Sequence, residues 1–441
     1  MTRLELKRRH LTYLKSKMKL DKPPVYNTIR SFWIFIAILS IIISIRIYAI
    51  YDSYRDFISK PFIITNATVI YSESREKNGY NYTLLKLKTD DNMEFYTVTN
   101  DETALQSKKI RIKLSPSADI TFWRYLGTPF IQSSISEIAG TVPKTSKDSV
   151  IEFIHAQHQN PQLKSLFASL YLATPLDKEI RQPVTALGIA HIVALSGFNL
   201  SILWGVIYGL LWLIYRPFQQ RYFPYRYAFM DLGFIALLGL GYYVWFVDFS
   251  PSLIRAYLMV LAGWGIMLLG MELVSFYFLA TISMIMLALF PRLLVSLSFW
   301  FSVAGVFYIF LVLHYTKSIG KNIIKWLAIP FGVFLFMQPI VHTFFGGVSW
   351  WQFVSIPLEV IYVVFYPLMI PLHMLGYGGV SDTLLLKLFA LPPKEIAQSI
   401  LPWWGLALFV IMSLASIISK KAFIALCVAT LGYCIYIFMF V

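Results

Sequence analysis

Charged residues are scarce in this 441-residue chain. Asp, Glu, Lys and Arg together make up 14% of it, against about a quarter in a typical soluble domain. Hydrophobic residues make up 57%. This balance excludes an ordinary water-soluble protein and predicts an integral membrane protein.

Cysteine and histidine are also scarce. Cys427 and Cys434 are the two cysteines, and both lie in the last apolar stretch, which excludes a disulfide framework. His155 and His158 flank Ala-Gln without neighbouring carboxylates, so the pattern favours a solvated helix face over a metal site. The phosphate-binding loop Gly-x-x-x-x-Gly-Lys-Ser/Thr is missing as well. We therefore expect no catalytic residues, no metal and no cofactor.

Acidic residues are outnumbered, 23 to 38, and the formal net charge is +15. Much of the excess precedes the first apolar stretch, which favours a cytoplasmic topology signal that contacts anionic lipid over a DNA-binding arm. The charged segment is too long for a cleavable signal peptide, and no small-residue cleavage site follows. We expect a basic cytoplasmic arm over 1–31 and a first transmembrane helix over 32–51, which places the next segment outside the membrane.

Residues 60–125 alternate apolar and polar side chains in short runs separated by turn residues. Four or five such strands predict a small all-β barrel, most simply of the oligonucleotide/oligosaccharide-binding (OB) type, although a small sandwich has the same pattern. We expect this domain to be extracytoplasmic. The segment 126–182 that follows has short helical spacings, which suit amphipathic helices at the outer interface.

Nine further apolar stretches complete a fold of about 9–10 transmembrane helices: 184–214, 229–247, 253–270, 272–290, 293–314, 322–345, 352–375, 402–419 and 422–440. Basic residues in the loops test this layout. Counting crossings places Arg221, Lys321, Lys387 and Lys394 inside, as the positive-inside rule expects. The pair Lys420-Lys421 is placed outside, so either 376–401 contains a re-entrant piece or the pair is an exception.

Polar side chains interrupt the second apolar stretch between residues 191 and 201. His191, Ser196 and Asn199 would share one broad face if the stretch is a single helix, and Gly197 allows close backbone approach or a break. This cluster predicts a pathway or a packing seam. Glu359 lies at membrane depth and must be paired, protonated or facing water, whereas Arg255 at the start of a span has interfacial anchoring as an equal alternative.

Four separated motifs in this order resemble the ComEC family of competence proteins. They are Gly188-Ile-Ala-His191-Ile-Val-Ala-Leu-Ser196-Gly197-Phe-Asn199; Ser250-Pro-Ser-Leu-Ile-Arg255-Ala-Tyr-Leu-Met259; Leu297-Ser-Phe-Trp-Phe-Ser302-Val-Ala-Gly305; and Met337-Gln338-Pro339 with the segments from Phe345 to Leu368. Glu359 departs from the pattern, because the family more often has Asn there. The resemblance implies a competence channel domain over 183–375, followed by a linker and transmembrane helices over 376–441.

The same resemblance implies a channel for single-stranded DNA in the inner membrane during natural transformation. Many members carry a metallo-β-lactamase-like domain with a His-x-His-x-Asp-His site, and that pattern is missing here, so a separate nuclease is expected. Further expected partners are a DNA receptor outside and a motor or strand-binding proteins in the cytoplasm. The candidate DNA pathway comprises His191, Ser196, Gly197, Asn199, Ser201, Arg255, Gln338 and Glu359.

In the barrel, the candidate phosphate contacts are Lys108, Lys109, Arg111 and Lys113, and the candidate stacking group is Tyr96. A secondary transporter of a small solute or lipid is the alternative, since broken helices and membrane carboxylates suit it equally well. An intramembrane hydrolase using Ser196 and His191 is disfavoured, because an offset of five on one helix places them poorly for a direct hydrogen bond.

Overall fold

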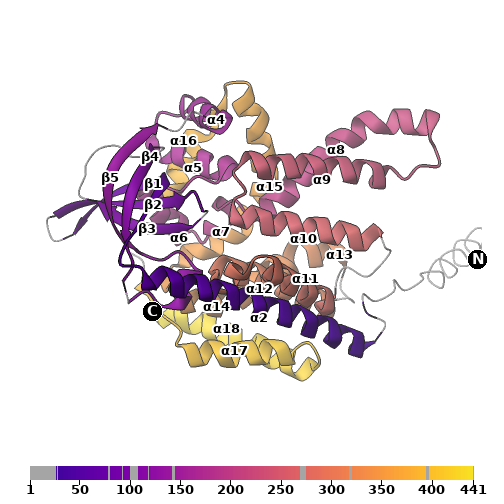
Figure 1. The fold of residues 1–441 in the computed structure, drawn as a ribbon. Helices are drawn as coiled ribbons and strands as arrows, with labels where there is room; N and C mark the ends of the chain where they lie inside the picture. Colours follow the sequence, from indigo (N-terminus) through magenta and orange to yellow (C-terminus); the bar gives the residue numbers. More distant parts are fainter. Residues whose placement is uncertain are drawn as a thin grey trace, which may run out of the picture.

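A computed structural model describes residues 26, 28–77, 80–91, 93–99, 108–117, 119–141, 145–268, 275–316, 320–393 and 397–440. Helices dominate it, and a small β-sheet lies at one end of the helical bundle (Figure 1). We call this end of the bundle the sheet end and the opposite one the far end. The predicted loop residue Lys394 lies outside the described residues.

Five antiparallel strands form the sheet: β1 (Ile63–Lys77), β2 (Tyr80–Thr89), β3 (Glu94–Thr99), β4 (Lys108–Ser115) and β5 (Gln132–Thr141), in the order β3-β2-β1-β4-β5. A parallel bridge between Tyr96 and Phe130 brings β3 beside the chain that leads into β5 and closes the sheet. A closed five-stranded order of this kind is that of a Greek-key OB barrel.

The barrel extends beyond the predicted limit at 125, because β5 falls in the segment predicted as amphipathic helices. That strand is rich in serine and has only isolated apolar side chains, so its sequence gives little β signal. Strand residues such as Leu85, Phe95 and Ile110 have no exposed surface, and Phe57 joins their cluster from the helix before the sheet. That helix, α2 (Ile29–Ser59), is longer than the predicted 32–51 and carries the barrel on its last turn.

Between the barrel and the bundle lie four short helices: α4 (Ser146–His155), α5 (Pro161–Leu172), α6 (Lys178–Ala186) and α7 (Ala190–Val193). The prediction of interfacial helices fails for α5, which is buried on nearly all sides. The short apolar run of α5 predicts an amphipathic helix when the sequence is considered alone. In the structure, α5 packs inside the largest hydrophobic cluster of the described residues.

Six helices of the described chain are long and apolar enough to cross a membrane: α2, α8 (Gly197–Tyr222), α9 (Ala228–Phe246), α12 (Leu297–Tyr315), α15 (Ser355–Met374, with the preceding turn) and α18 (Lys420–Phe440). Four shorter apolar helices accompany them: α10 (Pro251–Leu268), α11 (Phe276–Leu289), α14 (Ile329–Phe344) and α17 (Trp403–Ala415). The protein is therefore a multi-spanning α-helical membrane protein with a small β domain.

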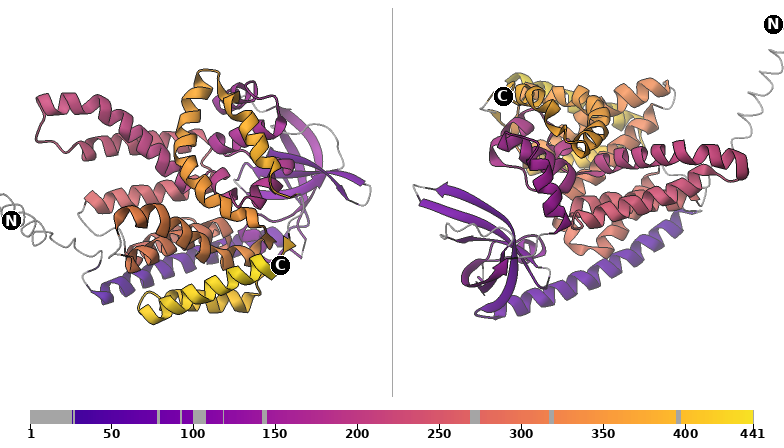
Figure 2. Two further views of the ribbon diagram at one scale, coloured as in Figure 1. Left: turned by 180° about the vertical axis from the view of Figure 1, so that it is seen from behind. Right: turned by 90° about the horizontal axis from the view of Figure 1, so that it is seen from above.

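One segment leaves the sheet end and returns to it. Strand β6 (Gly347–Val348), after α14, pairs with β7 (Ala397–Gln398), before α17, and the Ser399 amide donates to the Gly346 carbonyl over 2.7 Å. Between them, α15 and α16 (Asp382–Ala390) form a hairpin that runs across the direction of the other long helices (orange in Figure 2). The segment 347–398 therefore makes no net crossing of the bundle.

This return changes two loop assignments. Helix α17 runs from the sheet end to the far end, so Lys420 at the start of α18 lies at the far end, as does the last turn of α8, which holds Arg221 (Figure 1). Lys387 belongs to α16, which packs on α6 at the sheet end, so its predicted placement with the other basic loops is wrong. The re-entrant alternative for the C-terminal region is the one that the structure supports.

Candidate functional site

The chain breaks between α7 and α8, so 184–214 is not one helix. Ser196 has extended backbone, and its hydroxyl accepts a hydrogen bond from the Phe198 amide (3.3 Å), which makes it the N-cap of α8. Gly188, after α6, has a φ of +68°, a conformation that favours glycine. His191, Ser196 and Asn199 therefore do not share a helix face, because Ser-Gly starts a new helix at 197.

Side chains satisfy the carbonyl groups that the break leaves free. Asn199 donates from Nδ2 to the Ile192 carbonyl (3.3 Å), and Ser252 donates to the Leu195 carbonyl (2.8 Å). Asn199 is only 1% exposed, and its Oδ1 accepts from the Ser196 hydroxyl at 3.5 Å. Unsatisfied backbone groups are expensive at membrane depth, so these contacts stabilise the break. Asn199 holds the backbone here and lies away from any open surface.

His191 and Glu359 form a direct pair across the site. His191 Nε2 lies 2.7 Å from Glu359 Oε1, joining α7 to α15 across 168 residues of sequence. The His191 side chain is 55% exposed and that of Glu359 is 29% exposed. Of the states expected for Glu359, the structure supports a paired one. Ser201 is exposed on the first turns of α8 and donates to the Gly197 carbonyl.

Arg255 is buried between α10 and α12, at 5% exposure. Its Nη1 donates to the Ser298 hydroxyl over 2.6 Å and to the Ser296 hydroxyl over 3.4 Å, while its Nε has no hydrogen-bond partner among the described residues. Within that same set no carboxylate lies within ion-pair distance of the guanidinium. Interfacial anchoring is thus the wrong interpretation of Arg255. A buried cation without an anion is expensive and indicates a functional position.

Two pathway candidates differ in their surroundings. A Cβ atom added at Gly197 would lie 3.3 Å from the Cβ of Ala256, so glycine permits the close approach of α8 to α10. Gln338 is buried at 7% exposure in α14, a helix that packs against α12, α17 and α18. Helix α14 also contacts α15, the helix that carries Glu359.

The basic side chains predicted to bind phosphate divide between the two faces of β4. Lys109, Arg111 and Lys113 alternate with the buried Ile110 and Ile112 and share the outer face, while Lys108 has the register of the inner face. Lys109 pairs with Asp90 (3.1 Å), and the Lys113 ammonium lies 4.4 Å from the centre of the Phe62 ring. Tyr96 lies on β3, which is two strands from β4 through β5 and three strands from it through β1 and β2.

A different row of side chains surrounds Tyr96. The strand register places Tyr71 on β1 opposite Lys86 on β2, and Lys86 opposite Tyr96 on β3. Lys86 also pairs with Glu94 over 2.6 Å. The strand 2–3 face is the one that OB domains use for oligonucleotides. The alternation over 80–88 contained the signal for Lys86, but the bulge after Val69 that brings Tyr71 into this row could not be read from sequence.

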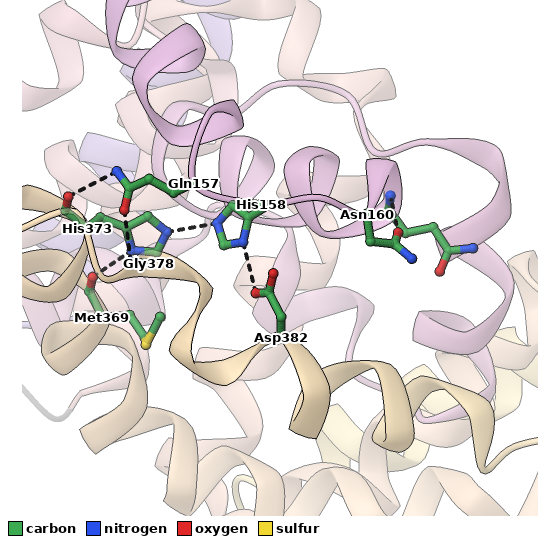
Figure 3. A network of polar contacts seen from close by, with 8 residues as sticks. Gln157, His158, Asn160, Met369, His373, Gly378 and Asp382 are labelled. Carbon is green, nitrogen blue, oxygen red and sulfur yellow. Dashed lines mark hydrogen bonds and ion pairs between the residues drawn. The ribbon is translucent and has the colours of Figure 1, made fainter.

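A buried polar network joins the turn after α4 to the α15–α16 hairpin (Figure 3). His158 Nδ1 lies 2.9 Å from Asp382 Oδ1, and His158 Nε2 lies 3.1 Å from His373 Nε2. His373 Nδ1 donates to the Met369 carbonyl over 2.7 Å. The solvated face predicted for His158 is wrong: the ring is 3% exposed and stacks on Phe167 at 4.6 Å.

Proton counting shows what this network requires. Three hydrogen bonds run through the two imidazoles, and each needs one proton. Two neutral imidazoles supply two, so the fully bonded network holds one proton more than two neutral histidines and an ionised Asp382. Gln157 completes the contact by donating to the His373 carbonyl and accepting from the Gly378 amide. The network fixes the fold-back of α15 and α16.

Comparison with known proteins places the site within a family. Residues 173–441, more than half of the chain, match the family described as "Competence protein". The match begins ahead of the predicted limit at 183 and includes the C-terminal helices of 376–441. A protein of Aquifex aeolicus (strain VF5), described as an uncharacterized protein, is 28% identical over 229 residues, which are 51% of this chain and 48% of that protein. The shared region thus spans about half the length of that relative.

No solved structure matches this chain. The broken segment before α8, Arg255 and the His191–Glu359 pair all fall within the matched residues. The chain therefore belongs to the competence protein family, whose members are membrane proteins with a general role in DNA uptake.

Proposed function

We propose that this protein forms the path by which single-stranded DNA crosses the inner membrane during natural transformation. The observation that carries the proposal is the position of a helix break, a buried unpaired arginine and a polar pair within the residues that match the competence family. A conduit of this kind has no catalytic role, so the nuclease, the motor or strand-binding proteins and the external DNA receptor would be separate proteins.

The charges around the break suit a strand that must pass without being held. Each nucleotide brings one negative charge, so a tolerable path is polar and slightly positive. Arg255 contributes a buried positive charge near the sheet end, and Ser201 and His191 offer polar surface on the exposed side of α7 and α8. Pairing with His191 masks the Glu359 carboxylate, which would otherwise repel phosphate.

The barrel would receive the strand first. Tyr71, Lys86 and Tyr96 form one row across three strands, and Lys109, Arg111 and Lys113 form a second basic row on β4. Aromatic rings stack on exposed bases, and basic side chains follow the backbone, so either row suits a single strand better than a duplex. The far end of the bundle would face the cytoplasm, because Arg221 and Lys420 lie there.

We expect cysteine labelling to confirm this orientation. In a background with Cys427 and Cys434 replaced by alanine, single cysteines at the exposed positions 387, 221 and 420 would be treated with a membrane-impermeant maleimide in intact spheroplasts. The cysteine of Lys387→Cys is expected to react, while those of Arg221→Cys and Lys420→Cys react only after lysis. Labelling of position 221 or 420 in intact cells contradicts the layout.

A deletion strain tests the function directly. In a transformable host, loss of the gene is expected to leave DNA accumulation outside the inner membrane unchanged while single-stranded DNA in the cytoplasm disappears. Complementation with the intact gene provides the control. Cytoplasmic DNA at the normal level in the deletion strain contradicts the proposal.

A secondary transporter is the second candidate, since a broken helix next to a carboxylate is typical of transporter sites. Normal transformation of the deletion strain, together with loss of uptake of a small solute or lipid, would favour it.

A further inference from the structure

A cavity of about 370 Å³ lies among the helices before α8, and one of its lining residues, Arg181, contacts the barrel through Tyr71. It extends from α6 to the chain at Ala194 and Leu195, directly before the helix break. Its polar lining comes from Ser169, Thr174, Arg181, Thr185, Ser250 and Ser252. Ligand pockets span about 300–1,000 Å³, so this volume suits one small polar unit and excludes a stack of bases.

Arg181 is the cationic residue of this lining. Its Nε donates to the Leu176 carbonyl (2.7 Å), and one Nη donates to the Tyr71 hydroxyl (3.0 Å). Burial raises the pKa of Tyr71, so the phenol stays neutral and accepts this bond. These two contacts fix the guanidinium plane and use only two of its five N–H groups.

The charge of Arg181 is not neutralised by direct contact. Among the described residues no carboxylate lies within ion-pair distance of it, and Asp177 and Glu73 act on it only at longer range. The cavity lining contains no acidic residue. Glu73 is engaged by Arg75 at 2.7 Å, which, despite the opposing effect of burial, lowers the pKa of the Glu73 carboxyl. Asp248, close to Ser250 at the rim, pairs with Lys147 at 2.8 Å.

An unsatisfied hydroxyl lies in the same cavity. Thr174 Oγ1 is buried and has no hydrogen-bond partner among the described residues. A buried polar atom without a partner costs free energy unless a ligand or water satisfies it. Ala173, the preceding lining residue, is the left-handed C-cap of α5 (φ 54°), and its amide donates to the Ser169 carbonyl.

We infer that this cavity binds one phosphodiester group of the single strand as it passes from the barrel to the break before α8. Arg181 supplies the cationic donors, and Thr174 with the serine hydroxyls supplies neutral ones. The position supports a strand over a lipid headgroup, because Tyr71 links Arg181 to the row of Lys86 and Tyr96 on the barrel. The inference rests on the proposed function. It adds the site at which the strand first contacts the helical domain after leaving the barrel.

The test uses the full chain in nanodiscs of phosphatidylcholine and a fluorescent thymidine decamer. Arg181→Gln is expected to raise the dissociation constant by about 10-fold, the effect of losing one charge-assisted contact. It is also expected to reduce the slope of log affinity against log salt by about 0.7, the value for one phosphate on a single strand. Thr174→Val keeps the side-chain shape and is expected to weaken binding by about 3–5-fold.

Arg124→Gln is the matched control. Arg124 lies on α3 (Phe122–Leu126) at the same end of the molecule and lines a different cavity. The substitution therefore removes the same charge as Arg181→Gln, but outside the proposed site. This control is expected to keep both the wild-type affinity and the wild-type slope. A decamer with uncharged methylphosphonate linkages is expected to bind equally weakly to the wild type and to Arg181→Gln.

Four results would overturn the inference. If both Arg181→Gln and Thr174→Val bind the decamer like the wild type, this cavity is not a binding site for the strand, and the proposed function is unaffected. Equal losses in Arg181→Gln and Arg124→Gln indicate general electrostatics. If phosphatidylglycerol vesicles compete with the decamer only when Arg181 is present, the cavity binds a lipid headgroup instead of the strand. A wild-type protein that binds no single strand at low salt contradicts the proposed function itself, and the inference with it.

Discussion

Arg255→Leu is expected to insert and fold normally but to lower transformation by about 100-fold. The wild-type guanidinium is buried at 5% exposure with two serine hydroxyls as its partners, so leucine removes a desolvated charge and leaves no buried anion behind. Replacing a buried charge by an apolar side chain is often neutral or stabilising. Function should suffer, because a charge-assisted contact to phosphate is worth about 1.5–3 kcal/mol, or about 10–100-fold in affinity.

Two variants separate a functional role from a structural one. Arg255→Lys keeps the charge but not the two-pronged geometry, so an intermediate transformation frequency is expected. Arg292→Leu makes the same substitution at an exposed arginine between α11 and α12 and is expected to transform normally. Thermal unfolding of the purified proteins is the second measurement. If Arg255→Leu unfolds at a much lower temperature than the wild type, the residue holds α10 to α12 and the channel role is not supported.

The membrane architecture could be predicted from hydropathy, with two instructive failures. Apolar stretches identify ten helices with good accuracy because each must exclude water along its length. The same rule hides the break before α8, since the Ser196-Gly197 start signal lies inside a continuously apolar stretch. It also counts α15 as a crossing, although contacts remote in sequence, such as β6 with β7 and His158 with Asp382, return that segment to the sheet end.

The candidate site was predicted as a set of residues but not as an arrangement. His191 and Glu359 were singled out separately because each is costly at membrane depth. Their pairing depends on α15 folding back, which no local pattern encodes. Arg181 gave no signal in the sequence, because one arginine in a polar segment is ordinary there. Its isolation from carboxylates and its contact with Tyr71 exist only in the assembled fold.

His191→Ala is expected to lower transformation by about 10-fold or more, although the imidazole itself need not touch DNA. Its Nε2 lies 2.7 Å from Glu359 Oε1, and alanine leaves that carboxylate facing the path without a partner. Two like charges about 4 Å apart repel by roughly 4 kcal/mol at an effective dielectric constant near 20. A passing phosphate would meet this repulsion at each nucleotide.

The double variant distinguishes masking from direct contact. Glu359→Asn alone is expected to transform near the wild-type level, because it removes the carboxylate and keeps a polar side chain. His191→Ala combined with Glu359→Asn is then expected to recover transformation to within about 3-fold of the wild type, because no bare carboxylate remains. Non-additivity of this sign is characteristic of residues that act through each other. If the double variant is as defective as His191→Ala, the imidazole contacts the strand itself, and the masking role of the pair is wrong.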